Sequence, residues 1–118
     1  TPNFYKRDFL KGWSPPHPSF FVKKKTHNLY GLYKTKIGNP ADLDLMYRFM
    51  EKKKVKSEYI DKILVRMRYG GKSNESFKQI FRQNIQILDI LEIKFNIIKI
   101  LKFVSFKIIN RFKQIIYK

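Results

Sequence analysis

The stretch NPADLDLMYRFMEKK, residues 39–53, is the best-marked structural element of the sequence and predicts a helix. Asn39 is a favourable N-cap, Pro40 suits the first helical position, and Asp42 opposes the helix dipole from the first turn. Asp44 is turned away from the apolar side and is expected to form a surface ion pair with Arg48, four residues further on. The apolar side faces a core and contains Leu43, Leu45, Met46, Tyr47, Phe49 and Met50.

Strand-like and loop-like segments flank this helix. Residues 1–18 contain a run of prolines and are expected to form a rigid, extended loop. Residues 19–22 form a short apolar run, and residues 55–60 and 62–69 predict two strands. Residues 26–30 predict one helical turn closed by Gly31, and a second long helix is expected to start with Ser73 as its cap.

The composition limits the class of protein. The 118 residues suffice for one modest domain, and 26 Lys and Arg against 9 Asp and Glu give a formal net charge of +17. The absence of Cys excludes disulfides, thiolate metal sites and a Cys nucleophile, and the two His have no third ligand at a zinc-like spacing. The charge predicts an anionic partner, which could be nucleic acid, anionic lipid or a phosphorylated substrate.

The last 26 residues, 93–118, form a segment of their own that follows residues 1–92. After Glu92 there is no acidic residue, and Lys or Arg interrupts every apolar run before it could span a membrane. On a helix, nine Ile, Leu, Val and Phe residues fall in one arc about 140° wide, whereas Phe95, Phe103 and Phe106 fall on the basic side. This amphipathic basic helix could pack on the protein itself or bind an anionic lipid surface.

The start of the helix at 39–53 and the proline run before it carry side chains suited to chemistry. Asp42, at the start of the helix and on its core side, is well placed for a general base, although it could merely oppose the helix dipole. Trp13 and His17 flank the proline run, where Trp13 could stack on a sugar ring and His17 could hydrogen-bond a hydroxyl or phosphate. The alternative is that both pack on the body of the protein. Asp42 and Asp44 also form a D-x-D string, but helix neighbours point apart, so no metal site is expected there.

A Gly-Gly turn after the second predicted strand is a candidate phosphate site. Arg68 precedes Gly70 and Gly71, and Ser73 begins the following helix. Exposed backbone N–H groups beside an Arg suit a phosphate, although a Gly-Gly pair between two elements is more often only a turn.

Three motifs, in this order and spacing, resemble the C-terminal half of family 2 glycosyltransferases. They are GWSPPHPSFFV at residues 12–22, ADLDLMYRF at residues 41–49 and VRMRYGGKSN at residues 65–74. The resemblance covers about residues 12–76 and implies an α/β fold of the GT-A type for residues 1–92, followed by the basic helix. It also implies inverting transfer of a sugar from a nucleotide-sugar donor to an acceptor hydroxyl, in polysaccharide or glycolipid biosynthesis.

The resemblance assigns roles to the candidate residues. Asp42 falls on the catalytic base of the family, and His17 and Trp13 would lie beside the acceptor. Arg68 would lie near the donor diphosphate, together with Gly70, Gly71 and Ser73. Ala41 departs from the family, which usually has an acidic residue directly before the base.

The same resemblance implies what lies outside these residues. The nucleotide-binding strands of the family and the D-x-D that holds its divalent metal, Mg or Mn, would precede residue 1. We therefore expect the isolated chain to be an inactive fragment of an enzyme located at the cytoplasmic face of the cell membrane. Its expected partners are a nucleotide-sugar, a saccharide or lipid-linked acceptor and an anionic membrane surface.

Two functions without catalysis compete with this interpretation. A small nucleic-acid-binding protein would use Lys and Arg on phosphates and Phe and Tyr on bases, but the charges are spread along the chain and no module signature is present. Nucleic acid is therefore not an expected partner. A membrane-surface protein or scaffold would need only residues 93–118.

Overall fold

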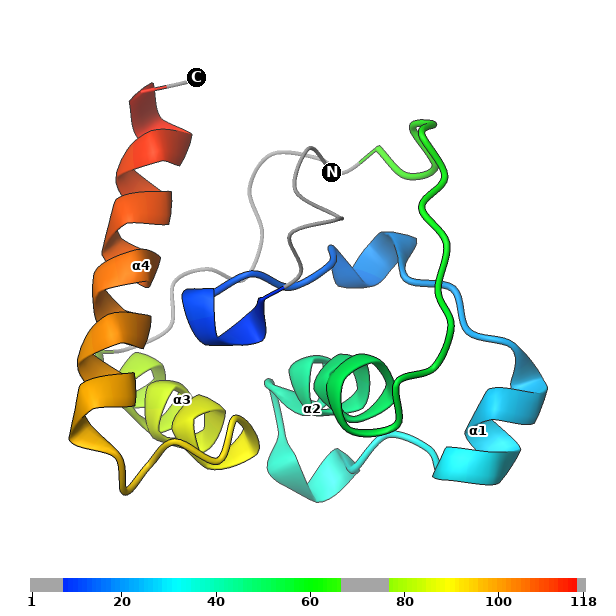
Figure 1. The fold of residues 1–118 in the computed structure, drawn as a ribbon, viewed down its shortest axis with the longest axis horizontal. Coiled ribbons are helices and arrows are strands. Elements are labelled where there is room, and N and C mark those ends of the chain that lie inside the picture. The colour runs from blue at the N-terminus through cyan, green and yellow to red at the C-terminus, as the bar shows by residue number, and fades with distance from the viewer. Residues whose placement is uncertain (1–7, 67–76, 117–118) are drawn as a thin grey trace.

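The structure is a computed structural model that describes residues 8–66 and 77–116. Four α-helices and several short 3₁₀ and π elements (η) follow one another along these residues (Figure 1). In chain order the elements are η2 (Phe9–Lys11), η3 (His17–Ser19), α1 (Lys24–Tyr30), η4 (Thr35–Ile37), α2 (Ala41–Tyr47), η5 (Arg48–Lys52), α3 (Phe77–Ile90) and α4 (Ile97–Ile116).

The α/β fold expected for residues 1–92 is wrong, because the described residues form helices and no strand. Strands were expected at residues 19–22, 55–60 and 62–69. Beyond the 3₁₀ turn that ends at Ser19, the described residues of these segments follow irregular paths (Figure 1, green for 55–60 and 62–66). Residues 67–69 lie outside the described residues. A strand is completed by hydrogen bonds to a neighbouring strand, and none of the described segments provides one. Several apolar side chains at residues 62–66 consequently stay in contact with water, and Ile63 is 79% exposed.

Residues 41–52 form the predicted long helix, with its boundaries displaced by one or two residues. Pro40 occupies the N-cap position, so the helix begins at Ala41. Beyond Tyr47 it widens into the π turn η5, in which the Lys53 N–H donates to the Arg48 carbonyl over 2.9 Å. Phe49 and Met50 are neighbours in this turn and are both buried.

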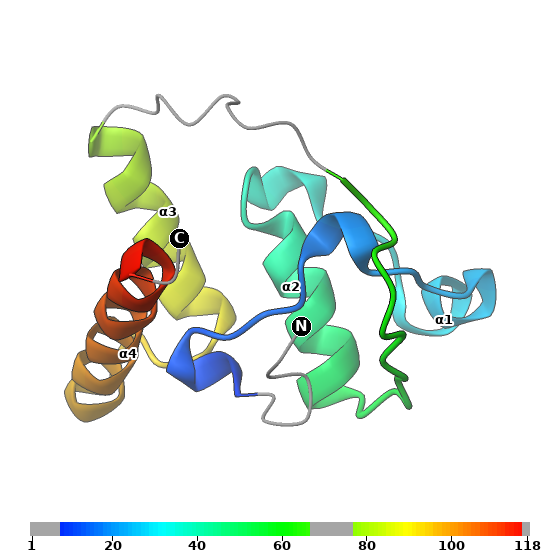
Figure 2. The same ribbon diagram turned by 90° about the horizontal axis from the view of Figure 1, so that it is seen from above.

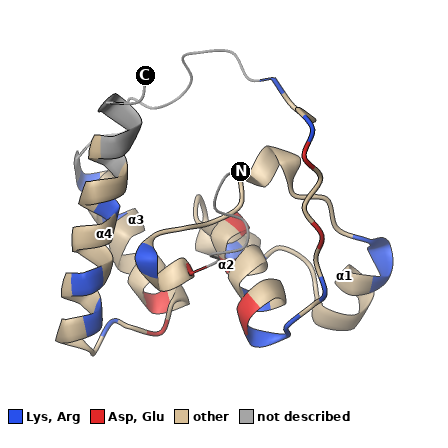
Figure 3. Ribbon diagram, turned by 45° about the horizontal axis from the view of Figure 1, so that its top comes forward, with Lys and Arg blue, Asp and Glu red and all other residues tan. Residues whose placement is uncertain are grey.

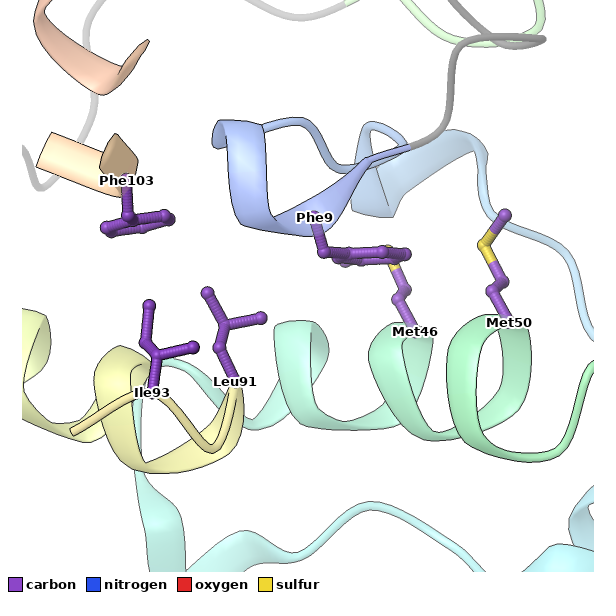
Figure 4. Packing of buried hydrophobic residues seen from close by; sticks show 6 residues of the cluster. All are labelled: Phe9, Met46, Met50, Leu91, Ile93 and Phe103. Atoms are coloured by element: carbon purple, nitrogen blue, oxygen red, sulfur yellow. The ribbon is translucent and has the colours of Figure 1, made fainter. Parts of the chain in front are cut away.

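The hydrophobic core joins segments from both ends of the described chain. Phe9 of η2 lies over α2, while Phe103 of α4 points toward the turn that follows α3 (Figure 4). Side chains from α2, η5 and that turn complete a cluster of six buried residues, namely Phe9, Met46, Met50, Leu91, Ile93 and Phe103. The view from above shows α3 and α2 as neighbours and α4 at the side away from α1 (Figure 2).

Candidate functional site

An open cavity of about 390 Å³ lies where the proline run, the start of α2 and one face of α3 meet. Its walls combine apolar surface with a carboxylate, an imidazole, a hydroxyl and two amides. The residues that line it are Ser14, Pro15, Pro16, His17, Asn39, Pro40, Asp42, Leu43, Met46, Gln83 and Ile87.

Asp42 and His17, both predicted from the sequence as site residues, face each other in this cavity. The Asp42 Oδ2 atom lies 3.9 Å from the His17 Nε2 atom, which is longer than a direct hydrogen bond. The Asp42 side chain is 43% exposed and the His17 side chain 62% exposed. A polar ligand in the cavity can therefore reach both groups from solvent.

Local backbone structure holds each of the two side chains in place. Asp42 is the second residue of α2, and the fixed φ of Pro40 directs the chain into that helix. His17 begins η3 between two prolines, and the Phe20 N–H donates to the His17 carbonyl over 3.1 Å. The Ser19 hydroxyl donates to the Pro16 carbonyl, also over 3.1 Å, and closes the same turn. The imidazole is thus positioned mainly by a stiff backbone.

Trp13 lies outside the set of residues that line the cavity. Its ring packs edge-on against Phe9, with ring centroids 5.6 Å apart and an interplanar angle of 78°. It is half-buried and belongs to the shell around the hydrophobic core. This placement fits the packing alternative for Trp13, because a ring in this position supports η2.

Asp44 has the predicted partner, but the prediction of a surface ion pair is wrong because Asp44 is buried. Its Oδ1 atom accepts a hydrogen bond from Lys34 Nζ over 3.0 Å, and its Oδ2 atom lies 3.5 Å from Arg48 Nε. The Arg48 guanidinium also donates to the carbonyls of Tyr30 and Leu32, the latter over 2.8 Å. Asp44 and Arg48 therefore clamp α2 to the chain that leaves α1, which is a structural role.

The remaining predictions concern the phosphate turn and metals. Arg68, Gly70, Gly71 and Ser73 lie outside the described residues. Among the described residues, no group of three His, Cys, Asp or Glu side chains could hold a metal ion.

Two amides in the cavity were not predicted from the sequence. Asn39 was assigned only to capping, and Gln83 was taken as part of a helix without a role. Gln83 and Ile87 lie four residues apart on α3, so they share the face that completes the cavity. The sequence shows that Gln83 and Ile87 share a helix face. It does not show that this face meets the cavity, because the rotation of α3 against α2 follows from tertiary packing.

Comparisons with protein-family models, with curated proteins and with solved structures find no match to this chain. Among the described residues, no helix has the length and apolar character needed to cross a membrane. The function is therefore inferred from the cavity and from the side chains that line it.

Proposed function

We propose that this chain carries the acceptor site and the catalytic base of an inverting glycosyltransferase. The observation that carries the proposal is the pairing of Asp42 with His17 across one open cavity. The motif resemblance assigns Asp42 to the catalytic base and places His17 beside the acceptor. The proposal concerns the site and its chemistry, and it does not need the sheet that the resemblance implied.

The Asp42 carboxylate acts as general base in this mechanism. It accepts the proton of an acceptor hydroxyl while that oxygen attacks the anomeric carbon of the donor sugar. The new C–O bond forms on the face opposite the nucleoside diphosphate, whose bond to the sugar breaks, so the anomeric configuration inverts. His17, whose Nε2 atom lies 3.9 Å from Asp42 Oδ2, donates to or accepts from a neighbouring hydroxyl and orients the acceptor.

The character of the cavity walls suits a carbohydrate. Prolines and Leu43 offer apolar surface for the C–H face of a sugar ring, while the amides of Asn39 and Gln83 offer donors and acceptors for hydroxyl groups. The carboxylate of Asp42 is the acidic group in the lining, so a neutral acceptor fits better than an anionic one.

The donor and the metal involve residues beyond this cavity. A divalent cation, Mg or Mn, on the donor diphosphate would need ligands from elsewhere, because the described residues contain no group that fits one. No step of the mechanism is assigned to it. We place the reaction at the cytoplasmic face of the cell membrane, where a soluble nucleotide-sugar can meet a saccharide or lipid-linked acceptor.

The proposal is tested by replacing Asp42 with Asn in the protein expressed from its natural gene. Transfer of labelled sugar from a panel of nucleotide-sugars is expected to fall at least about 10²-fold, because the general base is lost. Donor binding, measured by calorimetry, should be unchanged. The matched control is Asp89→Asn, because Asp89 is similarly exposed at 49% and is ion-paired with Lys94 away from the cavity. Near-normal transfer by Asp42→Asn would show that the base lies elsewhere.

A further inference from the structure

One face of α4 is fastened to the rest of the protein. Phe103 is buried in the hydrophobic core, and the Asn110 Nδ2 group donates to the Lys11 carbonyl over 3.1 Å. One turn before Asn110, Lys107 Nζ donates to Asn84 Oδ1 of α3 over 2.6 Å. The helix is therefore held by the side that the sequence pattern marks as basic.

The opposite face of α4 carries the long apolar arc, and the described side chains of that arc are exposed. Leu101 is 63% exposed, and at about 100° per residue it lies roughly 160° around the helix from Phe103. Ile98, Ile108, Ile109 and Phe112 are also exposed. We call these five residues, with Leu101 among them, the outer face of α4. A helix of this length is about 30 Å long, so the outer face is a continuous apolar strip rather than scattered side chains.

A protruding aromatic residue extends the apolar surface just before α4 begins. Phe95 lies in the turn between α3 and α4 and is 97% exposed. The ammonium of Lys94 lies 5.9 Å from the centroid of its ring. An aromatic ring beside a cation suits the boundary between lipid tails and headgroups, because the ring can contact the tails while the ammonium contacts the headgroups.

The charged residues of α4 itself all have one sign, whereas Lys94, just before the helix, is ion-paired with Asp89. Lys99 and Lys102 are exposed, and no acidic residue follows Glu92 in the chain. Lys102 borders a shallow groove of about 280 Å³ whose other walls include Ile98, Leu101 and Ile109. Blue bands without red follow the described part of α4 (Figure 3). The aliphatic stem of a lysine can cover apolar surface while its ammonium reaches a phosphate.

We propose that the outer face of α4, together with Phe95, is a docking surface for an anionic lipid membrane, on which α4 lies flat. An apolar strip bordered by Lys is complementary to acyl chains beneath negatively charged headgroups. A second copy of the chain would bring two basic borders together, which opposes pairing through this face. A nucleic acid would leave the apolar strip unused. The proposal goes beyond sugar transfer and stands without it.

Vesicle flotation with the full 118-residue chain tests the proposal. We expect binding to vesicles of phosphatidylcholine with phosphatidylglycerol, weak binding to phosphatidylcholine alone, and release by salt. Leu101→Gln with Ile108→Gln should lower the partition coefficient roughly a hundredfold, because each side chain contributes about tenfold. Lys102→Gln should lower it about fivefold. Both apolar residues are exposed, so the fold should survive, and circular dichroism verifies this.

The matched control places the same two changes on exposed apolar residues outside α4. Leu29→Gln with Ile63→Gln should bind anionic vesicles as the wild type does. Equal loss in both double variants, or wild-type binding by Leu101→Gln with Ile108→Gln, would overturn the proposal. It would equally be overturned if the wild type ignored vesicles and formed a dimer that the α4 substitutions dissociate, or if it bound only nucleic acid. None of these measurements involves sugar transfer, so failure here is distinct from failure of the proposed catalysis.

Discussion

Replacing Arg48 with Met should destabilise the protein by about 3 kcal/mol, which is large for a domain of this size. The Arg48 side chain is only 14% exposed and that of Asp44 only 10%. Methionine keeps an apolar side chain of similar length and removes the guanidinium, whose central carbon lies 5.2 Å from the centroid of the Phe49 ring. The substitution therefore isolates the polar part of the clamp between α2 and the chain that leaves α1.

The magnitude follows from the groups left without a partner. The Tyr30 carbonyl loses a partly buried, charge-assisted hydrogen bond, which contributes about 1.5 kcal/mol. Asp44 stays buried with Lys34 as its remaining cation, and the uncompensated Oδ2 atom adds a similar cost. The Leu32 carbonyl is bonded at an exposed site, so water replaces that bond at little cost.

Urea unfolding followed by the fluorescence of Trp13, the single tryptophan, measures the effect. The expected loss corresponds to a fall in Tm of about 12 °C. Lys34→Met is the control, because that side chain is 56% exposed and its removal should cost less than about 1 kcal/mol. A double-mutant cycle with Asp44→Asn should show that the effects of Asp44 and Arg48 are coupled by about 1 to 3 kcal/mol.

One outcome would refute this reasoning. If Arg48→Met cost no more than Lys34→Met, and the cycle with Asp44→Asn gave additive effects, the clamp would not stabilise the fold. The contacts of Arg48 would then contribute no more to the free energy of unfolding than an exposed ion pair does, although the side chain is largely buried.

Two further predictions concern pH and backbone conformation. Burial, assisted by the Glu92 carboxylate, raises the pKa of Tyr47 above its ordinary 10.0. The neutral Tyr47 side chain therefore stabilises the folded protein fully below pH 10, and this contribution is lost as the pH rises through the raised pKa. Urea unfolding at about pH 9 and about pH 11 should show this loss, Tyr47→Phe should reduce it, and an equally steep loss in Tyr47→Phe would contradict the assignment. Gly31→Ala should cost about 2 kcal/mol or more, because φ is +89° and the new Cβ would lie 3.2 Å from the Arg48 guanidinium. Gly12→Ala, with φ of +70° and only ordinary contacts, should cost about 1 kcal/mol, and the opposite order in thermal unfolding would contradict this account.

Elements fixed by local chemistry could be predicted from the sequence. The helix at 39–53 and the turn closed by Gly31 follow from signals within a few residues, and the structure places α2 with η5, and α1, at these positions. The predicted cap was wrong, because Pro40 rather than Asn39 stands at the N-cap and makes no side-chain capping bond. The Gly31 N–H donates to the His27 carbonyl over 2.8 Å, as a helix end requires. The strands predicted at 55–60 and at the described residues 62–66 are wrong, because a strand-like pattern indicates only that a segment could pair with another strand. The partner strand is a non-local property, and the described residues contain none.

The face by which α4 packs could not be predicted either. Hydrophobic periodicity favours the Ile and Leu arc, yet Phe103, from the other side, enters the core. Gly12, which ends η2, lies against α4, and an added Cβ there would meet the Lys107 Cα atom at an ordinary contact distance of 3.8 Å. The packing of α4 on η2, rather than hydropathy, therefore selects this face of the helix. The motif resemblance implied that His17 and Asp42 belong to one site. The position of Gln83 in the cavity wall could not be predicted, because it depends on how α3 is rotated against α2.

The composition of the core also determines when the chain can finish folding. Phe9 shares its cluster with Leu91, Ile93 and Phe103, so the first described element packs against the last. During synthesis α1 and α2 can form early, but the core stays open until Phe103 has left the ribosome. Closing a loop across most of the chain makes this step slow compared with helix formation. Until then Phe9 and Met46 are accessible to chaperones and proteases, so translation of α4, rather than formation of α2, completes this core.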